Sequence, residues 1–178
     1  MSTKKWSLDP AHSELQFKVK HMMVSNVTGD FQNFQVEVET PEETLENAKI
    51  KFTAETDSVS TGNAQRDGHL KSGDFFDSTK FPELTFQSSS FKKLNQDGEY
   101  ELKGDLTIKD VTKPVTLKVN HGGTAKDPWG NTKAGFSVSG KINRKDWGLN
   151  YNAVLETGGV LVSDEVRILA ELEMTAPN

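Results

Sequence analysis

The sequence predicts an all-β fold of about eight antiparallel strands in a single domain, residues 1–178. Apolar and polar residues alternate with a period of two in successive segments, which indicates strands with one buried face. Short turn signals separate these segments, and no spacing suits a helical crossover between parallel strands. The 178 residues contain no linker, internal repeat or low-complexity tract, so one sizeable core is expected.

The alternation is clear in the first predicted strand, where Leu15, Phe17, Val19 and His21 share one face and charged or polar residues occupy the other. The same pattern recurs along the chain. The eight predicted strands cover residues 14–21, 30–39, 48–54, 84–94, 100–108, 115–121, 134–142 and 166–174. The main turn signals are Asn95–Gly98, Lys113-Pro114, Asp127–Gly130 and Gly158-Gly159.

Two of these strands are irregular. Phe31 and Phe34 are out of phase, which predicts a bulge or bend near Asn33. In the segment 84–94 the apolar face changes among the serines. Neither irregularity argues against an antiparallel sheet.

One or two short helices are expected. Thr40-Pro41-Glu42-Glu43 is a capping box with proline at the first helical position. Asn63 is a candidate N-cap for a second helix, on which Asp67 and Lys71 would pair at i,i+4. Gly68 lowers the stability of that helix by about 1 kcal/mol, so it requires tertiary support.

Eight antiparallel strands with one apolar face each form either a sandwich or a closed barrel. An eight-stranded barrel is either filled by side chains or holds one slender ligand. Small residues on the inward faces either leave a channel or accommodate strand coiling; they are Ala48, Ala54, Gly104, Ala134, Gly140 and Ala170. In a channel with apolar walls, a ten-carbon chain contributes roughly 8 kcal/mol before association costs.

Composition excludes several classes of function. A net charge of -5 argues against nucleic acid or an anionic membrane surface as the main partner, and the absence of cysteine excludes disulfides and thiolate chemistry. No stretch approaches the ~20 apolar residues of a transmembrane helix, so membrane insertion is not expected. Without an apolar run after the first lysines, we expect a cytoplasmic protein, or a periplasmic one if a leader has been removed.

The polar cluster between Asn63 and Asp77 allows three functions. Arg66 has the planar fork that suits phosphate, carboxylate or carbonyl oxygens, and His21 ends a strand where a barrel mouth is expected. Asp67 and His69 could hold a metal, although zinc requires three or four ligands. The cluster is therefore an active site, a clamp for the polar end of a ligand, or only a charged connector. For the protein as a whole, the alternatives to lipid binding are a metal-dependent or other enzyme that uses the histidines with Asp67, and a filled barrel that acts as an interaction module.

Five motifs in order resemble the YceI-like family, the lipocalin-like polyisoprenoid-binding proteins of bacteria. They are WSLDPAHSELQFKVKHMMVSNVTGDF, QRDGHLKSGDFFDSTKFPELTFQS, GDLTIKDVTKPVTL, GFSVSGKINRKDWGLN and VSDEVRILAELE, and they cover essentially the whole chain. The resemblance implies an extended eight-stranded antiparallel barrel with a lipocalin-like interior, often a homodimer. It also implies binding of a long-chain isoprenoid or fatty lipid, of quinone or polyprenyl phosphate type, without enzymatic activity.

Alternation and resemblance together predict a ligand-binding set with an apolar part and a polar part. The predicted residues are Phe17, Val19, His21, Phe31, Phe52, Arg66, His69, Leu70, Phe75, Phe76, Phe136 and Trp147. No catalytic residue, metal ligand or cofactor is predicted. The expected function is to carry, store or sequester the lipid.

Overall fold

The fold consists of eleven strands, one α-helix and three short 3-10 helices (η). The strands are β1 (Thr3–Leu8), β2 (Glu14–His21), β3 (Ser25–Phe31), β4 (Phe34–Pro41), β5 (Lys49–Glu55), β6 (Val59–Ser60), β7 (Glu83–Lys93), β8 (Glu99–Ile108), β9 (Val111–Lys126), β10 (Thr132–Asn143) and β11 (Val162–Ala176). The helices are η1 (Pro10–His12), η2 (Thr56–Ser58), α1 (Ala64–Lys71) and η3 (Arg144–Trp147). The computed structural model describes residues 3–22, 24–41, 44–152 and 162–176, and these counts refer to them.

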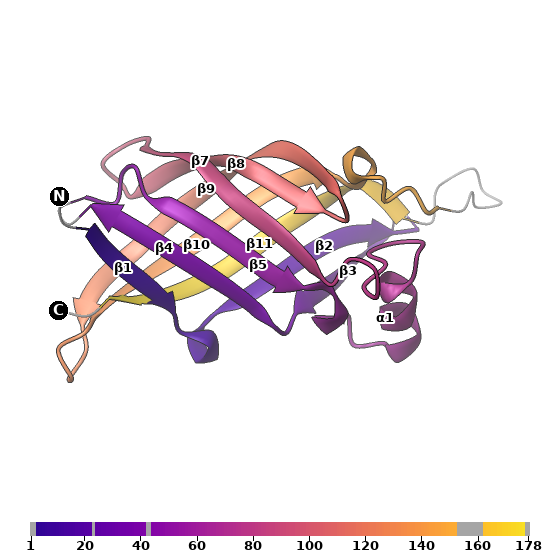
Figure 1. Ribbon diagram of the computed structural model, residues 1–178, viewed down its shortest axis with the longest axis horizontal. Helices are drawn as coiled ribbons and strands as arrows, with labels where there is room; N and C mark the ends of the chain where they lie inside the picture. Colours follow the sequence, from indigo (N-terminus) through magenta and orange to yellow (C-terminus); the bar gives the residue numbers. More distant parts are fainter. Residues whose placement is uncertain (1–2, 23, 42–43, 153–161, 177–178) are drawn as a thin grey trace.

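The strands form one antiparallel sheet that closes into a barrel. Neighbours follow the order β1-β4-β5-β7-β8-β9-β10-β11, and β1 also pairs with β11, which closes the ring (Figure 1). The prediction of an extended, lipocalin-like, eight-stranded antiparallel barrel is confirmed. The short strand β1 was not predicted, because its segment has only a few apolar residues among lysines.

The barrel wall has eight strand positions, and at three of them a helix or a bend divides the chain into two shorter strands. β1 and β2 both pair with β11, and η1 separates them. A bend at Gln32 and Asn33 separates β3 from β4, and η2 separates β5 from β6. The halves β2, β3 and β6 extend the wall toward the end of the barrel at which α1 lies (Figure 1).

Both predicted irregularities are present. The bend at Asn33 brings Phe31 and Phe34 to the same inner face. The register of β7 on β8 shifts between Ser88 and Ser90. The hydroxyl of Ser88 accepts a hydrogen bond from the Ile50 amide at 2.8 Å, so the bulge keeps the neighbouring backbone paired.

One predicted turn is wrong. Lys113-Pro114 lies inside β9, and the turn before it is formed by Lys109 and Asp110. Pro114 is tolerated because β9 pairs with β10 only from Lys118 onward, so the missing N–H faces no neighbouring strand. The predicted turn at Gly158-Gly159 lies outside the described residues.

The two predicted helices differ in outcome. α1 forms as expected, and the Asn63 side chain accepts a hydrogen bond from the Arg66 amide. Its predicted Asp67–Lys71 pair is wrong, because Lys71 approaches Asp57 at 4.0 Å instead. The Thr40-Pro41 helix start is also wrong: both residues end β4, because the strand pairing with β1 continues to this point. Glu42 and Glu43 lie outside the described residues.

The small inward residues have two different roles. A Cβ on Gly104 would overlap the Phe86 ring, and one on Gly140 would overlap the Leu117 side chain. These glycines therefore let large neighbours lie flat against the sheet. Ala48 and Ala170, in contrast, line an internal cavity.

One end of the barrel is closed by a cluster that we call the Trp6 plug, made of Trp6, Val36, Ala134, Met174 and Ala176. All five are buried, and Met174 and Ala176 are almost completely inaccessible. The Trp6 indole N–H donates to the Thr40 hydroxyl at 3.0 Å, so the ring is both packed and hydrogen-bonded. These side chains therefore fill the barrel at this end.

Candidate functional site

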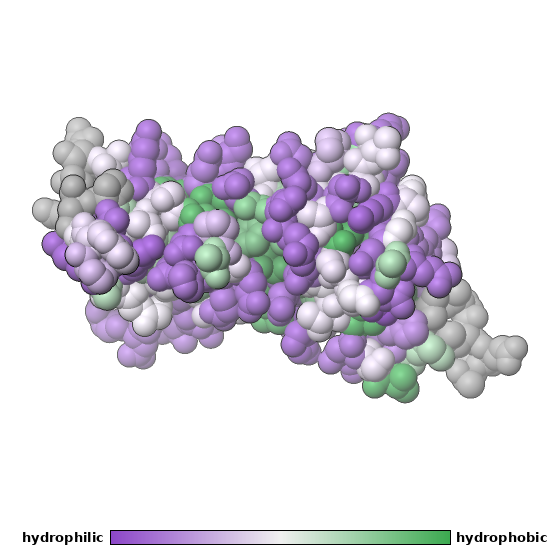
Figure 2. Space-filling view, turned by 90° about the horizontal axis from the view of Figure 1, so that it is seen from below, coloured by the Kyte–Doolittle hydropathy of each residue, from purple (hydrophilic) through white to green (hydrophobic). Residues whose placement is uncertain are grey.

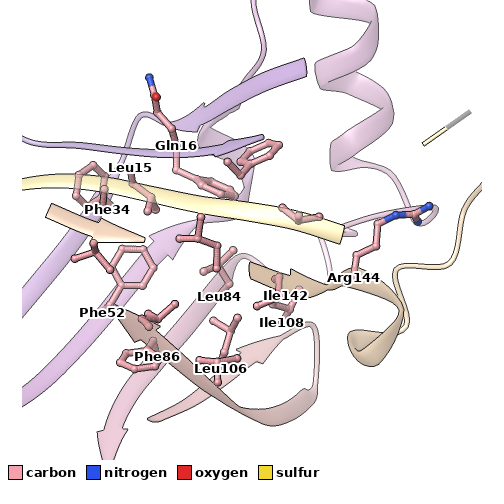
Figure 3. A pocket seen from close by; sticks show the side chains of 18 of the residues that line it. Leu15, Gln16, Phe34, Phe52, Leu84, Phe86, Leu106, Ile108, Ile142 and Arg144 are labelled. Atoms are coloured by element: carbon pink, nitrogen blue, oxygen red, sulfur yellow. The ribbon is translucent and has the colours of Figure 1, made fainter. Parts of the chain in front are cut away.

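The barrel encloses an apolar cavity of about 620 Å³. This volume lies in the range of about 300–1,000 Å³ that is typical of small-molecule sites. In the interior view, Phe34, Phe52, Phe86 and Ile142 converge on the empty space, whereas the Gln16 amide points away from it (Figure 3). The alternative of a filled barrel is therefore wrong.

The outside of the barrel is mostly polar. Figure 2 shows charged and polar side chains over most of one face, with apolar side chains visible between them near its middle. Among the described residues, every buried side-chain nitrogen and oxygen has a hydrogen-bond partner. The cavity wall, in contrast, consists mostly of apolar side chains and offers a ligand few polar groups.

Eleven of the twelve predicted ligand-binding residues line this cavity; that they contact a ligand stays a prediction. They are Phe17, Val19, His21, Phe31, Phe52, Arg66, His69, Leu70, Phe75, Phe76 and Phe136. Trp147 is the exception: only 2% of it is exposed, and it does not line the cavity. Its indole N–H donates to the Leu106 carbonyl at 2.8 Å, which anchors η3 against β8.

Several lining residues were not predicted. Most are inward-facing aliphatic or aromatic residues that the alternation would have identified. They include Leu15, Val27, Phe34, Val38, Ile50, Leu84, Phe86, Leu102, Leu106, Ile108, Val115, Leu117, Val119, Val138, Ile142, Val166 and Ile168. Arg144 and Tyr151 also line the cavity, but no periodicity marks them because they lie beyond the end of β10.

Aromatic rings from distant segments form one wall. The ring of Phe31 lies 5.7 Å from those of Phe17 and Phe76, measured between centroids. These side chains come from β3, β2 and the segment after α1, so the wall depends on the bend that turns Phe31 inward. Its tilted and edge-on contacts are favourable geometries for aromatic pairs.

Polar groups gather at the α1 end of the cavity. His69 lies on α1, and its Nε2 is 2.8 Å from Asp74 Oδ2. The His69 ring lies edge-on to Tyr151 at 4.5 Å and to Phe75 at 5.1 Å, between centroids. An imidazole with one apolar side and one carboxylate partner can place a polar atom at the cavity mouth while it stays packed.

Arg66 lies on the same helix and is exposed. Its Nε donates to the Thr61 hydroxyl at 2.7 Å and its Nη2 to the Thr61 carbonyl at 2.9 Å. Its Nη1 has no hydrogen-bond partner among the described residues and is available to a ligand. Asp67 accepts hydrogen bonds from the Thr61 amide and hydroxyl, so it pairs with Thr61 and not with His69.

Arg144 is the one strongly buried cation in the described wall, with 3% of the residue exposed. Its guanidinium donates to the carbonyls of Leu149, Tyr151, Val162 and Ser163. Burial lowers the pKa of Arg144, against a smaller opposing effect of Asp164 at 3.9 Å. Figure 3 shows the guanidinium turned away from the other lining side chains, so Arg144 fixes the cavity rim.

A separate polar cluster lies at η1, which connects β1 to β2. His12 Nδ1 is 2.9 Å from Asp9 Oδ2 and 3.2 Å from Glu173 Oε2, and Lys133 Nζ is 3.3 Å from Asp9. In the part of the chain that the structure describes, this is the only three-residue group with metal-ligand spacing. The Lys133 ammonium already neutralises Asp9, and none of these side chains lines the cavity. The predicted metal alternative, Asp67 with His69, does not form such a group.

The helices of the described residues are all too short or too polar to cross a bilayer.

Comparisons with known proteins agree with this geometry. A family model for the YceI-like domain matches residues 6–174. A UPF0312 protein of Staphylococcus aureus (strain N315) is 40% identical over 171 residues, which cover 96% of each chain. The YceI protein of Campylobacter jejuni, a solved structure, is 33% identical with a TM-score of 0.78, covering 96% of this chain and 97% of that one.

Two solved structures of lower identity share the fold. BcnA of Burkholderia cenocepacia is 24% identical, with a TM-score of 0.79 over 93% of this chain and 98% of that one. A polyisoprenoid binding domain from Saccharophagus degradans, implicated in plant cell wall breakdown, is 17% identical, with a TM-score of 0.69 over 97% and 98%. The barrel is thus preserved where most side chains differ.

Proposed function

The chain belongs to the YceI-like family, and from that premise we propose that it binds one long-chain isoprenoid or related lipid inside the barrel. The lipid is of the quinone or polyprenyl phosphate type. Its tail lies in the cavity and its headgroup lies at the α1 end. A fold neighbour described as a polyisoprenoid binding domain supports the choice of ligand class.

The apolar cavity is the observation that carries this proposal. Its walls are formed by Phe, Leu, Ile, Val and Met side chains, which exclude a polar or charged ligand tail. Each methylene removed from water contributes about 0.8 kcal/mol, so a long hydrocarbon chain supplies affinity without a catalytic group. A long apolar chain therefore matches the polarity of this interior.

The polar α1 end supports the orientation. Lys20, His21, Arg66 and His69 all line the cavity there, whereas the opposite end is closed by the Trp6 plug. A phosphate or carbonyl oxygen at this end can accept hydrogen bonds from the free Nη1 of Arg66. An inverted ligand would place its polar group against Val36 and Met174, where few donors are available.

We propose a carrier, storage or sequestering role and no catalytic step. Asp67 is engaged by Thr61, and His69 pairs with the half-exposed carboxylate of Asp74. These contacts favour positioning of a headgroup over acid–base chemistry. A protein that carries, stores or sequesters a lipid requires only a cavity and an opening through which the lipid enters.

Extraction of the purified protein tests the proposal. Protein prepared without detergent is extracted with organic solvent, and the extract is analysed by mass spectrometry. We expect one long-chain lipid at close to one molecule per chain. Delipidated protein should regain melting temperature when that lipid is added, because a ligand specific for the folded state stabilises it. An empty extract, together with no rise in melting temperature for any isoprenoid lipid, would overturn the proposal.

A further inference from the structure

A row of like charges crosses the outer face of the barrel near the α1 end. Lys141 on β10 lies directly opposite Arg167 on β11, and Arg167 lies directly opposite Lys18 on β2. Their sequence neighbours Ile142, Ile168 and Val19 face the cavity, so the cations face outward. Like charges directly opposite on neighbouring strands destabilise a sheet, so folding does not account for this row.

The row is poorly neutralised. Lys141 approaches Glu165 at 3.9 Å. Among the described residues, no carboxylate oxygen lies within 4.0 Å of the charged groups of Arg167 or Lys18. The segment 15–29 contains two lysines and no acidic residue, although the chain as a whole carries a net charge of -5.

Exposed apolar side chains follow the end of β2, the strand that carries Lys18. Met22 is 44% exposed and Val24 is 83% exposed, and both lie in the turn between β2 and β3. This turn follows His21, which lines the cavity. Lys18 precedes Met22 by four residues, about 13 Å along an extended strand. We call the cations Lys18, Lys141 and Arg167, together with Met22 and Val24, the docking lip.

We propose that the docking lip binds the surface of an anionic phospholipid bilayer. Cations attract acidic headgroups, and the apolar tip enters the interface once the protein is close. The small number of apolar anchors suits a reversible contact. This inference rests on the proposed function, since a docked lip holds the cavity mouth against the bilayer that supplies or receives the lipid.

The opposite end of the barrel provides a matched contrast. Trp129 is also 83% exposed and lies in the hairpin between β9 and β10. This hairpin is at the end of the barrel opposite α1 (Figure 1). It lies at the end closed by the Trp6 plug, where docking would bring no opening to the bilayer. The inference therefore predicts that Val24, and not Trp129, contributes to vesicle binding.

Vesicle sedimentation tests the inference. The protein is mixed with vesicles of phosphatidylcholine alone, or of three parts phosphatidylcholine to one part phosphatidylglycerol, at low and high salt. We expect binding to the anionic vesicles only, with loss at high salt. The double variant Lys18→Gln/Arg167→Gln should bind at least about fivefold more weakly. The double variant Lys92→Gln/Lys126→Gln, with the same change in net charge on exposed residues elsewhere, should bind normally.

Two single variants separate a membrane from other polyanions. Val24→Ser should weaken vesicle binding about threefold and leave binding to heparin unchanged, whereas Trp129→Ser should change neither. The inference is overturned if the wild-type protein ignores anionic vesicles. It is also overturned if Val24→Ser binds them normally, because the cations would then form a general polyanion site. It is overturned as well if Trp129→Ser weakens vesicle binding as much as Val24→Ser, because the vesicles would then bind at the opposite end of the barrel.

The cavity lipid of each variant is measured in the same preparations. Lipid in the cavity without vesicle binding refutes the docking lip and leaves the proposed function intact. Vesicle binding by a protein whose extract is empty, and whose melting temperature no isoprenoid lipid raises, refutes the proposed function alone.

Discussion

The two ends of the barrel are built from the same strands but are closed in different ways. At one end, Trp6 and its neighbours in the plug fill the space between β1, β4, β10 and β11. At the other end, α1 and the segment after η3 cover the opening with polar and aromatic side chains such as His69 and Tyr151. The difference gives the cavity a direction, because a polar headgroup finds hydrogen-bond donors at one end only.

The plug should be the most sensitive part of the molecule. Trp6→Ala removes a buried ring and leaves the Thr40 hydroxyl without its donor, so we expect the free energy of unfolding to fall by about 3–5 kcal/mol. Urea titration measures the loss. Trp129→Ala is the control, because an exposed side chain should change stability by no more than about 0.5 kcal/mol. Equal effects of the two substitutions would show that the plug is not tightly packed.

A single type of substitution can compare plug and cavity directly. Ala134 and Ala170 are both buried inward alanines on neighbouring strands, but only Ala170 lines the cavity. Ala134→Phe should overpack the plug and lower the free energy of unfolding by about 1–3 kcal/mol. Ala170→Phe should extend into empty space, cost less stability and displace most of the bound lipid.

The measurements are urea titration and the ratio of extracted lipid to protein for each variant. Folding losses in the reverse order would contradict the assignment of plug and cavity. Normal lipid content in Ala170→Phe would contradict the placement of the tail.

The α1 end should show a smaller and more selective effect. Arg66→Gln removes the free guanidinium Nη1, so we expect a phosphate-bearing polyprenyl lipid to bind about 10- to 100-fold more weakly, the range for a lost charge-assisted hydrogen bond. The uncharged polyprenol should bind almost as before. Fluorescence titration of both lipids gives the two affinities, and Lys126→Gln, exposed at the end of β9, is the control. Equal losses for both lipids would place the headgroup elsewhere.

The sequence predicts the wall of the barrel better than its ends. Period-two alternation places Phe17, Val19 and Phe52 on the inner face correctly, because each strand repeats the same environment. Even the bend at Asn33 can be predicted, because Phe31 and Phe34 would point to opposite faces of a straight strand. Alternation also separates the inward faces from the outward cations that form the docking lip.

The ends depend on contacts between residues that are distant in the chain. Trp147 was predicted in the binding set, yet it anchors η3 to the Leu106 carbonyl, a contact across 41 positions. Arg144 was missed because its carbonyl partners lie in loops and at a strand start, where no period exists. Whether inward alanines and glycines leave space also depends on neighbouring strands, as the Phe86 ring over Gly104 shows.

The smallest expected effect lies at η1, which joins β1 near the plug to β2 near the mouth. The hydrogen bond to Asp9 raises the pKa of His12 above its ordinary value of 6.5, and the charges of Asp9 and Glu173 act in the same direction; burial and Lys133 oppose them. The same hydrogen bond lowers the pKa of Asp9 from 3.8.

Because the pKa of His12 is raised in the folded protein, the protonated ring stabilises the fold below 6.5, and this contribution disappears as the pH rises through the raised pKa. The contribution of Asp9 is present above 3.8 and is lost only as the pH falls through its lowered pKa, so Asp9 stays ionised in the range where His12 titrates. The melting temperature of the wild-type protein should therefore exceed that of His12→Gln by more at about pH 5.5 than at about pH 8.5. In an Asp9→Asn background this pH-dependent difference should shrink, and an unchanged difference would show that His12 does not couple the two halves of the wall through Asp9.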